Sequence, residues 1–434
     1  MANGTAVGVV ATITRRAADR VRAGHLWVYR SDVERIATGT GDLETSGTLP
    51  SVPPGALVTV VDGRGIPLGT ALYSDASQIA LRLISRQPAV DRAAYLNDVR
   101  ARVRAAISLR QRVAAESFAQ AGNDDACRLL FSEADDLPGI VADRYGSLVV
   151  VQLLTQGTAQ DDVRAVLAEV FSEQPWAATV VERPDARVRE LEHLPPAPDS
   201  PLFVRTGSEP ELQTVFTING LRFHFDASAG QKTGAFLDQR LNYAAAARWA
   251  STGAADSGKT GRALDVCTYQ GGFALHLAQV CERVTGVDAS RAALEVADRN
   301  LALNLGLPAR VDWIEADAFE LLRDYADAGQ RFDTIVLDPP AFAKTRRAAE
   351  GALRGYKELN LRAIKMLSPG GTLVTCSCSH HVGLEEFTAV VRSAAEDAGR
   401  RVQLLETRAA APDHPAILSL PETSYLKCLI ARVG

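Results

Sequence analysis

Apolar segments alternate with helical segments along the second half of the chain. From about residue 240 onward, the apolar segments span residues 263–267, 284–288, 310–315, 334–338 and 372–375. The clearest amphipathic helices between them are predicted over 290–304 and 384–398. Strands spaced by helices of this length form right-handed crossovers and a parallel sheet. Two later apolar segments, 402–406 and 425–431, are expected to close that sheet.

The N-terminal part has a different pattern, in which short strands are separated by turn signals. Segments 57–62, 68–73 and 78–84 alternate or run apolar, with Gly63 and Gly65 between the first two. This pattern predicts a small β-barrel. Further upstream, the sequence predicts a strand over 7–13 and a basic helix over 15–22. A long arginine-bearing helix is predicted over 91–117.

The middle of the chain predicts an α+β unit followed by a hairpin. Strands are expected over 148–154 and 178–182 with a helix over 161–171, and residues 184–210 then hold six prolines. Asn219-Gly220 between two apolar strands predicts a two-residue hairpin turn. We therefore predict three domains. The barrel covers 1–88, a central α+β domain covers 89–211, and an α/β domain covers 212–434 and begins with the hairpin of 212–230.

The composition is that of a globular protein. The 434 residues are 47% apolar and 23% charged, which argues against a disordered or fibrous chain. No segment approaches the roughly 18 apolar residues of a membrane helix, and the N-terminus shows no secretory signal. Six cysteines are too few for a disulfide scaffold. We therefore expect a cytoplasmic protein with no membrane partner.

The net charge of −5 is unevenly distributed. Residues 1–112 contain fifteen Arg, no Lys and nine acidic residues, which is a net charge of +6 and leaves −11 on the remainder. A basic end on an acidic body favours a polyanionic partner. A solvated arginine-rich surface is an equally good explanation of the charge alone.

Acidic residues end three consecutive predicted strands. Asp265 ends the first strand before a turn that contains Gly271 and Gly272, Asp288 ends the second, and Asp317 follows the third. Open α/β sheets bind ligands at the carboxyl ends of their strands. We expect Asp288 to accept hydrogen bonds from a ribose and Asp317 to lie near an adenine amine. The alternative for each residue is a helix N-cap.

The turn after Asp265 does not have the dinucleotide pattern Gly-x-Gly-x-x-Gly. Cys267 and Tyr269 stand where further glycines would be expected, and Phe273 follows the glycine pair. A pyrophosphate needs close backbone amides more than S-adenosylmethionine does. S-adenosylmethionine is therefore favoured over NAD as the ligand of this edge. Its expected contacts in this turn are Asp265, Cys267, Tyr269, Gly271, Gly272 and Phe273.

The fourth strand is followed by Asp338, Pro339, Pro340 and, two residues later, Phe342. Prolines cannot continue a central strand because they lack the N–H group. They are expected to stop the chain sharply and to hold Asp338 at the edge of the sheet. A fixed carboxylate there can bind the polar edge of a planar base, although an ordinary turn after a strand is the simpler alternative.

The fifth strand ends with Cys376 and Cys378, followed by His380 and His381. No second Cys or His pair at ligand spacing is evident elsewhere, so a metal is weakly indicated and we expect none. A cysteine nucleophile beside Asp338 suggests other chemistry. A thiolate that adds to carbon 6 of a pyrimidine makes carbon 5 able to attack a sulfonium methyl group.

These residues resemble the class I S-adenosylmethionine-dependent methyltransferases. The closer resemblance is to the bacterial 23S ribosomal RNA large-subunit cytosine-5 methyltransferases, which carry an N-terminal PUA domain. The matching segments in the C-terminal half are residues 232–240, 269–273, 354–357, 377–379, 413–415 and 421–427. In the N-terminal half they are residues 25–29, Gly69, 77–79 and 136–146. The resemblance thus covers nearly the whole chain.

The resemblance implies a fold and a set of site residues. It implies a PUA-type barrel, a central α+β domain and a Rossmann-like methyltransferase domain, with S-adenosylmethionine as cofactor, S-adenosylhomocysteine as product and large-subunit ribosomal RNA as partner. It makes Cys378 the nucleophile and Cys376 a packing neighbour, with exchanged roles as the alternative. It also places Gln239 and Arg240 over the methionine end of the cofactor, with a salt bridge at the start of a helix as the alternative. Unlike other cytosine-5 RNA methyltransferases, the chain has no second cysteine beside Asp338.

Three functions compete at this stage. The first is cytosine-5 methylation of ribosomal RNA through a Cys378–carbon 6 adduct, with Asp338 as the second catalytic residue. The second is N-methylation of guanine or another exocyclic amine, which needs no thiol. The third is RNA binding without catalysis. The sequence leaves open whether the protein is a homodimer.

Overall fold

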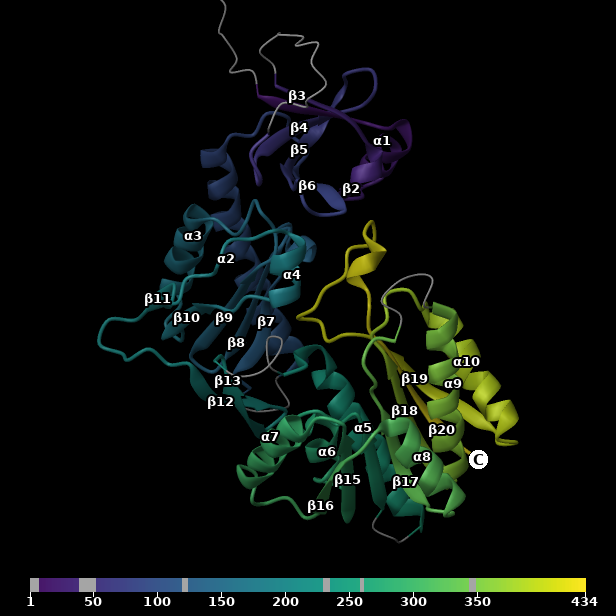
Figure 1. Cartoon of the computed structure of the whole chain (residues 1–434). Helices are drawn as coiled ribbons and strands as arrows, with labels where there is room; N and C mark the ends of the chain where they lie inside the picture. The colour runs from purple at the N-terminus through teal and green to yellow at the C-terminus, as the bar shows by residue number, and fades with distance from the viewer. Residues whose placement is uncertain (1–7, 39–51, 119–123, 229–234, 258–260, 343–348) are drawn as a thin grey trace, which may run out of the picture.

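The computed structural model describes residues 8–38, 52–118, 124–228, 235–257, 261–342 and 349–434. Val7, at the start of a predicted strand, and residues 232–234 of a matched segment lie outside these ranges. So do residues 229 and 230 at the end of the predicted hairpin region. Figure 1 shows the N-terminal sheet at the top, the central domain below it on one side, and the large α/β domain on the other.

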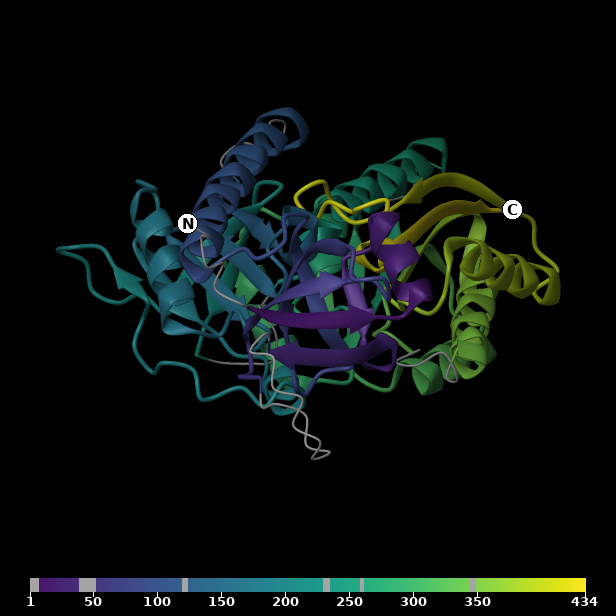
Figure 2. The same cartoon turned by 90° about the horizontal axis from the view of Figure 1, so that it is seen from above.

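The N-terminal domain is a six-stranded sheet in the order β2-β6-β5-β4-β1-β3. Its elements are β1 Val9–Ile13, α1 Arg15–Arg22, β2 Trp27–Tyr29, β3 Val33–Thr38, β4 Leu57–Val61, β5 Pro67–Tyr73 and β6 Ile79–Ser85. One apolar core, which includes Ala11, Val58, Ala71 and Leu81, fills its interior. Seen from above, the sheet lies over the junction of the other two domains (Figure 2).

The central domain has a five-stranded sheet in the order β11-β10-β9-β8-β7. Its elements are α2 Arg92–Ser117, β7 Ala126–Phe131, β8 Ile140–Tyr145, β9 Leu148–Leu153, α3 Asp161–Ser172, β10 Thr179–Glu182, α4 Ala186–Leu191 and β11 Phe203–Val204. The sequence pattern had indicated α2, α3, β9 and β10. Strands β7, β8 and β11 and helix α4 are additional.

The predicted hairpin joins two domains. Strands β12 (Gln213–Ile218) and β13 (Leu221–Asp226) pair antiparallel, and both turn residues, Asn219 and Gly220, have positive φ. Aromatic side chains of the hairpin, Phe216 and Phe225, stack or pack against Tyr145 of the central sheet. The same apolar cluster continues to Leu275 of the α/β domain. The hairpin is therefore shared core and belongs to neither domain alone.

The α/β domain contains a seven-stranded sheet in the order β16-β15-β14-β17-β18-β20-β19, which confirms the predicted α/β class. The first five strands are parallel, and the last two add antiparallel. The strands are β14 Arg262–Val266, β15 Arg283–Asp288, β16 Arg310–Glu315, β17 Phe332–Leu337, β18 Leu367–Ser377, β19 Val402–Arg408 and β20 Lys427–Val433. The helices are α5 Arg240–Ser257, α6 Gly272–Leu277, α7 Arg291–Ala302, α8 Ala318–Asp327, α9 Ala349–Met366 and α10 Leu384–Asp397.

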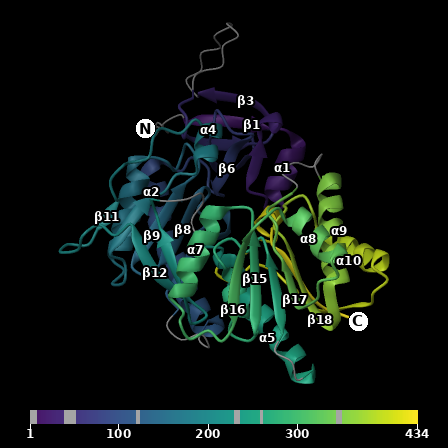
Figure 3. The same cartoon turned by 60° about the horizontal axis from the view of Figure 1, so that its bottom comes forward.

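Side chains of the central strands point alternately to the two faces of this sheet, and helices cover both faces. Val336 and Val374 face the core shared with α5 and α6, whereas Ile335, Leu337 and Leu373 face the core shared with α8, α9 and α10. Burial on both faces explains why these strands are apolar throughout. Figure 3 shows the parallel strands with α7 and α8 near them, and the carboxyl ends of the strands point toward the other domains.

Candidate active site

A cavity of about 660 Å³ opens at the carboxyl ends of the parallel strands. Its wall comes from the ends of β14, β15, β16, β17 and β18, from the segment before α5, from the segment between β19 and β20, and from β7 of the central domain. The lining residues predicted from the sequence are Gln239, Cys267, Tyr269, Asp288, Asp317, Asp338, Pro339, Pro340, Phe342 and Cys378. The structure thus brings most of the predicted site residues together.

Asp265 shapes the turn behind this wall and does not line the cavity. Its side chain is fully buried, and one carboxylate oxygen accepts hydrogen bonds from Thr268 Oγ1 (2.5 Å) and from the amide of Ala274 (2.9 Å). Burial raises the pKa of this carboxyl to about 7. The predicted direct contact with a cofactor is therefore replaced by an indirect role, in which Asp265 holds the turn after β14.

The turn itself has an unusual backbone. Cys267, Tyr269 and Gly271 all have positive φ angles, of 63°, 51° and 86°. A side chain on Gly272 would lie 2.6 Å from the ring of Tyr243. The two glycines are thus explained by backbone conformation and packing. Gly271, Gly272 and the buried Phe273 are not among the residues that line the cavity, and their contact with a cofactor, through the backbone of this turn, stays a prediction.

Asp288 and Asp317 line the cavity, and each already accepts backbone hydrogen bonds. Asp288 accepts from the amide of Tyr269 (2.9 Å) with one oxygen and from the amide of Ser290 (2.9 Å) with the other. One oxygen of Asp317 accepts from the first turn of α8, so this residue is also the helix N-cap that the alternative reading proposed. These bonds fix both carboxylates at the cavity wall, each with lone pairs left for a ligand.

Asp338 directly follows β17, which lies between β14 and β18 in the sheet. Gln239 Nε2 donates a 2.9 Å hydrogen bond to its carboxylate. Burial, followed by the nearby carboxylates of Asp238 and Asp265, raises the pKa of Asp338 to about 8. The carboxyl is therefore protonated at neutral pH. Pro339 is buried beside it, and the ring of Phe342 packs on Tyr356 at 4.8 Å.

Cys378 is held at the cavity by the serines on either side. The hydroxyls of Ser377 and Ser379 are both buried and both bond to the Tyr356 hydroxyl, at 3.0 and 2.9 Å. The intervening Cys378 lines the cavity, and its Sγ lies 3.9 Å from the carbonyl oxygen of Pro339. The strand ends that carry Asp338 and Cys378 are thereby in direct contact.

The other nearby cysteines are less suited to act as nucleophiles. Cys376 is fully buried opposite Cys428 in the β18–β20 pair, and burial together with Cys428 raises the pKa of its thiol well above the ordinary value. Burial, followed by the nearby carboxylate of Asp288, likewise raises the pKa of Cys267. A raised pKa suppresses the reactive thiolate.

Arg240 lies away from the cavity, contrary to the prediction. Its buried guanidinium donates to the carbonyl of Ala126 and to the carboxylate of Asp124, both at 2.7 Å, and lies 3.8 Å from the ring centre of Phe118. All three partners belong to the central domain. The sequence position beside Gln239 suggested a cofactor contact, but α5 begins here and directs Arg240 toward the neighbouring domain.

Replacing Arg240 by methionine is therefore expected to destabilise the protein by about 3–5 kcal/mol, because it leaves the Asp124 carboxylate buried without its cation. Urea unfolding would measure this change, and calorimetric titration should show nearly unchanged cofactor affinity. Arg248→Met is the matched control in the same helix, since the side chain of Arg248 is 59% exposed. A large loss of cofactor affinity in a folded Arg240→Met protein would restore the original prediction.

Five polar residues of the cavity were not named as site residues from the sequence: Arg128, Asp238, His380, His414 and Tyr425. Tyr425 donates a 2.5 Å hydrogen bond to Asp238, and His414 Nδ1 lies 2.9 Å from a carboxylate oxygen of Asp413. His414 and Tyr425 lie in the segments 413–415 and 421–427, which resemble the methyltransferase family. Arg128 comes from β7 of the central domain, and no sequence signal pointed to it.

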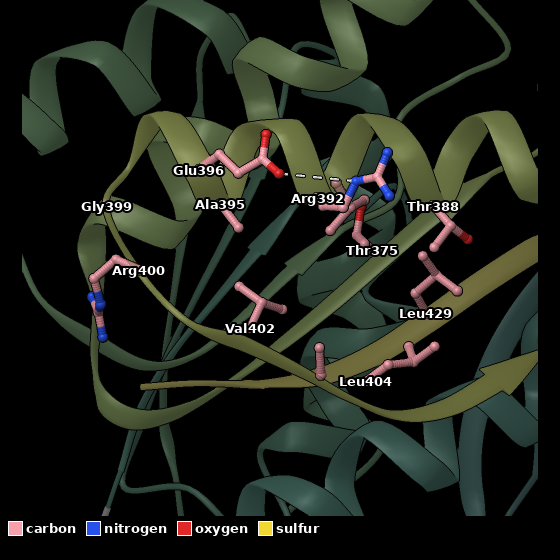
Figure 4. A pocket seen from close by; sticks show the side chains of 12 residues that line it. Thr375, Thr388, Arg392, Ala395, Glu396, Gly399, Arg400, Val402, Leu404 and Leu429 are labelled. Atoms are coloured by element: carbon pink, nitrogen blue, oxygen red, sulfur yellow. Dashed lines mark ion pairs between the residues drawn. The ribbon is translucent and has the colours of Figure 1, made fainter.

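A second, smaller cavity of about 340 Å³ lies between α10 and the strands β19 and β20 (Figure 4). Apolar side chains such as Val402, Leu404 and Leu429 form most of its wall, and the ion pair of Arg392 with Glu396 lies on its helical side. It contains none of the strand-end carboxylates. The first cavity is therefore the candidate active site.

The described residues contain neither a metal site nor a membrane-spanning helix. No cluster of three or more His, Cys, Asp or Glu side chains there is arranged to hold a metal ion. Among the described helices, none is both long and apolar enough to span a membrane.

Comparison with known proteins identifies the family. Residues 11–86 match the PUA-like domain, and residues 132–431 match the S-adenosylmethionine-dependent methyltransferase family. The chain belongs to this methyltransferase family. It is 38% identical over 412 residues to "Ribosomal RNA large subunit methyltransferase I" of Shewanella amazonensis, covering 94% of this chain and 95% of that protein. The protein of the same name from Erwinia tasmaniensis is 36% identical over 410 residues, with the same coverage.

Solved structures share the fold of the methyltransferase over its whole length. The crystal structure of SMU.776 in complex with SAH has a TM-score of 0.76 and 18% identity, covering 98% of this chain and 99% of that one. A Streptococcus mutans protein has a TM-score of 0.75 and 17% identity, with the same coverage. The predicted arrangement, with an N-terminal PUA-like domain and a methyltransferase domain, is confirmed.

The cofactor of this methyltransferase is S-adenosylmethionine, and the cavity residues fit it. Asp288 and Asp317 offer carboxylates at consecutive strand ends, as a ribose and an adenine amine require. The nearby lining also contains the apolar side chains of Val287, Ala316 and Phe319, which suit an adenine ring. The absence of three close glycines agrees with a ligand that has no pyrophosphate.

Proposed function

We propose that the protein methylates carbon 5 of a cytosine in large-subunit ribosomal RNA through a covalent bond between Cys378 and carbon 6. The observation that carries this proposal is the placement of Cys378 and Asp338 at adjoining strand ends of one cavity, with Cys378 Sγ 3.9 Å from the Pro339 carbonyl. The names of the two relatives support ribosomal RNA as the substrate.

The chemistry of the base explains the need for a thiol. Carbon 5 of a cytosine is a poor nucleophile, whereas the lone pair of an exocyclic amine needs no covalent help. When the Cys378 thiolate adds to carbon 6, the electron pair of the carbon 5–carbon 6 double bond becomes available at carbon 5. Bound S-adenosylmethionine supplies an electrophilic methyl group. Loss of the carbon 5 proton to a base then re-forms the double bond and releases the thiolate.

The protonated state of Asp338 favours cytosine over guanine. A neutral carboxyl offers one O–H donor and one carbonyl acceptor. Cytosine presents the complementary pair, a ring nitrogen acceptor at N3 and the N4 amine as donor, whereas guanine presents two N–H donors. Adenine has the same pattern as cytosine but lacks a pyrimidine carbon 6 for the thiolate. The pKa of about 8 for Asp338 therefore supports cytosine as the target.

The RNA is expected to contact the basic N-terminal end, where many arginines are already paired within the protein. In the PUA-like domain, Arg20 pairs with Asp32 and Arg22 with Asp62, both at 2.5 Å. On α2, Arg92 and Arg100 form ion pairs with carboxylates of α3, at 2.6 and 2.8 Å, and Arg104 pairs at 2.5 Å with Glu173, the residue directly after α3. Those charges are neutralised within the protein, so much of the basic excess on α2 is unavailable to phosphates. A target base must also leave its stack to reach the cavity. Cytoplasmic location and a homodimer remain predictions.

A trapping experiment tests the covalent route. Large-subunit ribosomal RNA transcribed with 5-fluorocytidine is incubated with the protein and S-adenosylmethionine. Fluorine cannot leave as a positive ion, so the proposed elimination is blocked and a protein–RNA adduct should persist on a denaturing gel. Ordinary RNA and the Cys378→Ser protein should give no adduct. Methylation of an exocyclic amine without any adduct would favour the alternative reaction.

A further inference from the structure

Lys427 is a buried cation close to Cys378. It is the first residue of β20 and pairs with Ser377 of β18, the neighbour of Cys378. Its ammonium donates hydrogen bonds of 2.7 Å to the carbonyl of Ser379 and 2.7 Å to the carbonyl of Tyr425. Within the described ranges it forms no ion pair with a carboxylate, and only 7% of the residue is exposed.

Lys427 and Tyr356 hold the same short segment from two sides. Tyr356 of α9 bonds to the hydroxyls of Ser377 and Ser379, while Lys427 of β20 bonds to the Ser379 carbonyl. Cys378 lies between these contacts and faces the cavity. The positive charge of Lys427 is therefore fixed at the carbonyl of the residue after Cys378. The same hydrogen bond holds the backbone beside the thiol.

A buried ammonium needs a compensating negative charge. Several titratable groups lie around Lys427 and Cys378, namely Tyr356 of α9, His380 after β18, Glu386 of α10 and Tyr425 before β20. Burial, and then the charge of Lys427, lower the pKa of His380, so its ring is neutral. Burial raises the pKa of Tyr356, and raises that of Tyr425 well above the ordinary value, so both hydroxyls are neutral. The Glu386 carboxylate accepts a 2.8 Å bond from the amide of Gly383 at the exposed start of α10.

We propose that Lys427 is a positioning residue that stabilises the Cys378 thiolate through its fixed positive charge. The proposal rests on the proposed function, because it gives Cys378 the role of nucleophile. Of the groups around the ammonium, Cys378 is the one whose negative charge forms and disappears during that reaction. Lys427 would therefore raise the fraction of thiolate before addition and favour its return when the bond to carbon 6 breaks.

The titration of Lys427 defines the pH range in which this can operate. Burial lowers the pKa of Lys427 to about 8, and the nearby Cys378 and Glu386 oppose that shift. The ammonium is present at neutral pH and is lost as the pH rises through about 8. The stabilising charge is therefore available at neutral pH, where an ordinary thiol with a pKa of about 8.5 is mostly protonated.

The rate of alkylation of Cys378 by iodoacetamide as a function of pH tests the proposal. Fragment-ion mass spectrometry of the peptide that contains Cys378 assigns the label to this residue, because Cys376 lies in the same peptide and the other four cysteines do not. The proteins to compare are wild type, Lys427→Gln, Lys427→Arg and the matched control Lys365→Gln, whose lysine is exposed at the end of α9. Glutamine can still donate hydrogen bonds to the two carbonyls but carries no charge, so it separates charge from scaffolding.

We expect Lys427→Gln to move the half-maximal alkylation rate to higher pH by about one to two units, a loss of reactivity of about tenfold or more at pH 7. Lys427→Arg should retain most of the reactivity, and Lys365→Gln should match wild type. A folded Lys427→Gln protein with an unchanged profile would overturn the proposal. If that variant does not fold, the wild-type profile decides: a midpoint at or above the ordinary thiol value of about 8.5 overturns it as well.

The two proposals can fail separately. Alkylation needs neither RNA nor S-adenosylmethionine, so it reports the effect of Lys427 on the thiol alone. If the shift is observed but RNA carrying 5-fluorocytidine gives no adduct, the charge effect stands and the covalent reaction fails. If the adduct forms and the shift is absent, Cys378 is the nucleophile and Lys427 only supports the backbone.

Discussion

Replacing Cys378 by serine is expected to lower methyl transfer to RNA by about 10³-fold or more, because an alcohol is a far weaker nucleophile than a thiolate near neutral pH. Binding of S-adenosylmethionine should change little, since the fixed carboxylates Asp288 and Asp317 are untouched. Methyl groups transferred to large-subunit ribosomal RNA would measure the first effect, and calorimetric titration the second.

Cys376→Ser is the matched control for this experiment. Cys376 is two residues away in the same strand, yet it is fully buried against Cys428 and does not line the cavity. Its replacement should cost stability but leave the folded protein active. Near-normal methyl transfer by Cys378→Ser would exclude the covalent mechanism, and loss of transfer in Cys376→Ser alone would exchange the roles of the two thiols.

Replacing Asp338 by asparagine is expected to separate base recognition from proton donation. An amide presents one donor and one acceptor edge, as the protonated carboxyl does, so affinity for the RNA should be nearly retained. The amide cannot give a proton to the ring, so methyl transfer should fall by about 10²–10⁴-fold. Wild-type transfer should itself decline above pH 8, where Asp338 loses its proton. Single-turnover rates and RNA binding measured in parallel would test both statements.

The same substitution should raise stability at alkaline pH. The pKa of Asp338 is raised from 3.8 to about 8 by folding, so the folded protein holds this proton more tightly than the unfolded chain does. That contribution is fully present below pH 3.8 and is lost as the pH rises through about 8. Asp338→Asn should therefore be more stable than wild type above pH 8, by on the order of 2–5 kcal/mol. Equal melting temperatures of the two proteins at pH 9 would contradict the raised pKa.

The periodicity of the sequence was sufficient to predict the sheet that positions the site. Strands β14, β15, β17 and β18 are apolar on both faces because helices cover both, and this pattern is local enough to read from the chain. It also placed Asp288, Asp338 and Cys378 at one edge. The pattern does not predict the direction of each side chain at a strand end. The Asp265 side chain points into the turn behind the cavity wall, where it bonds to Thr268 and Ala274.

The remaining differences come from contacts between domains. Arg240 and Arg128 are distant in sequence from their partners, and neither charge pattern nor spacing shows that Arg240 reaches Asp124 or that Arg128 reaches the cavity. The same holds for His414 and Tyr425. They stand in the long segment between β19 and β20, which folds back over the sheet edge toward the N-terminal domain (Figure 1). Such placement depends on tertiary packing, which no local signal encodes.

The shared hairpin core has a consequence for how this protein can be divided or recombined. The apolar cluster around Phe216 and Tyr145 joins the central sheet to the α/β domain, and Arg128 of the central domain forms part of the cavity wall. A gene fragment that encodes the seven-stranded sheet alone would expose that cluster to water and lack one wall of its own pocket. The smallest transferable catalytic module therefore includes both of these domains, and the N-terminal sheet is tied to it as well, because Leu72 and Ile84 belong to the core of the central domain.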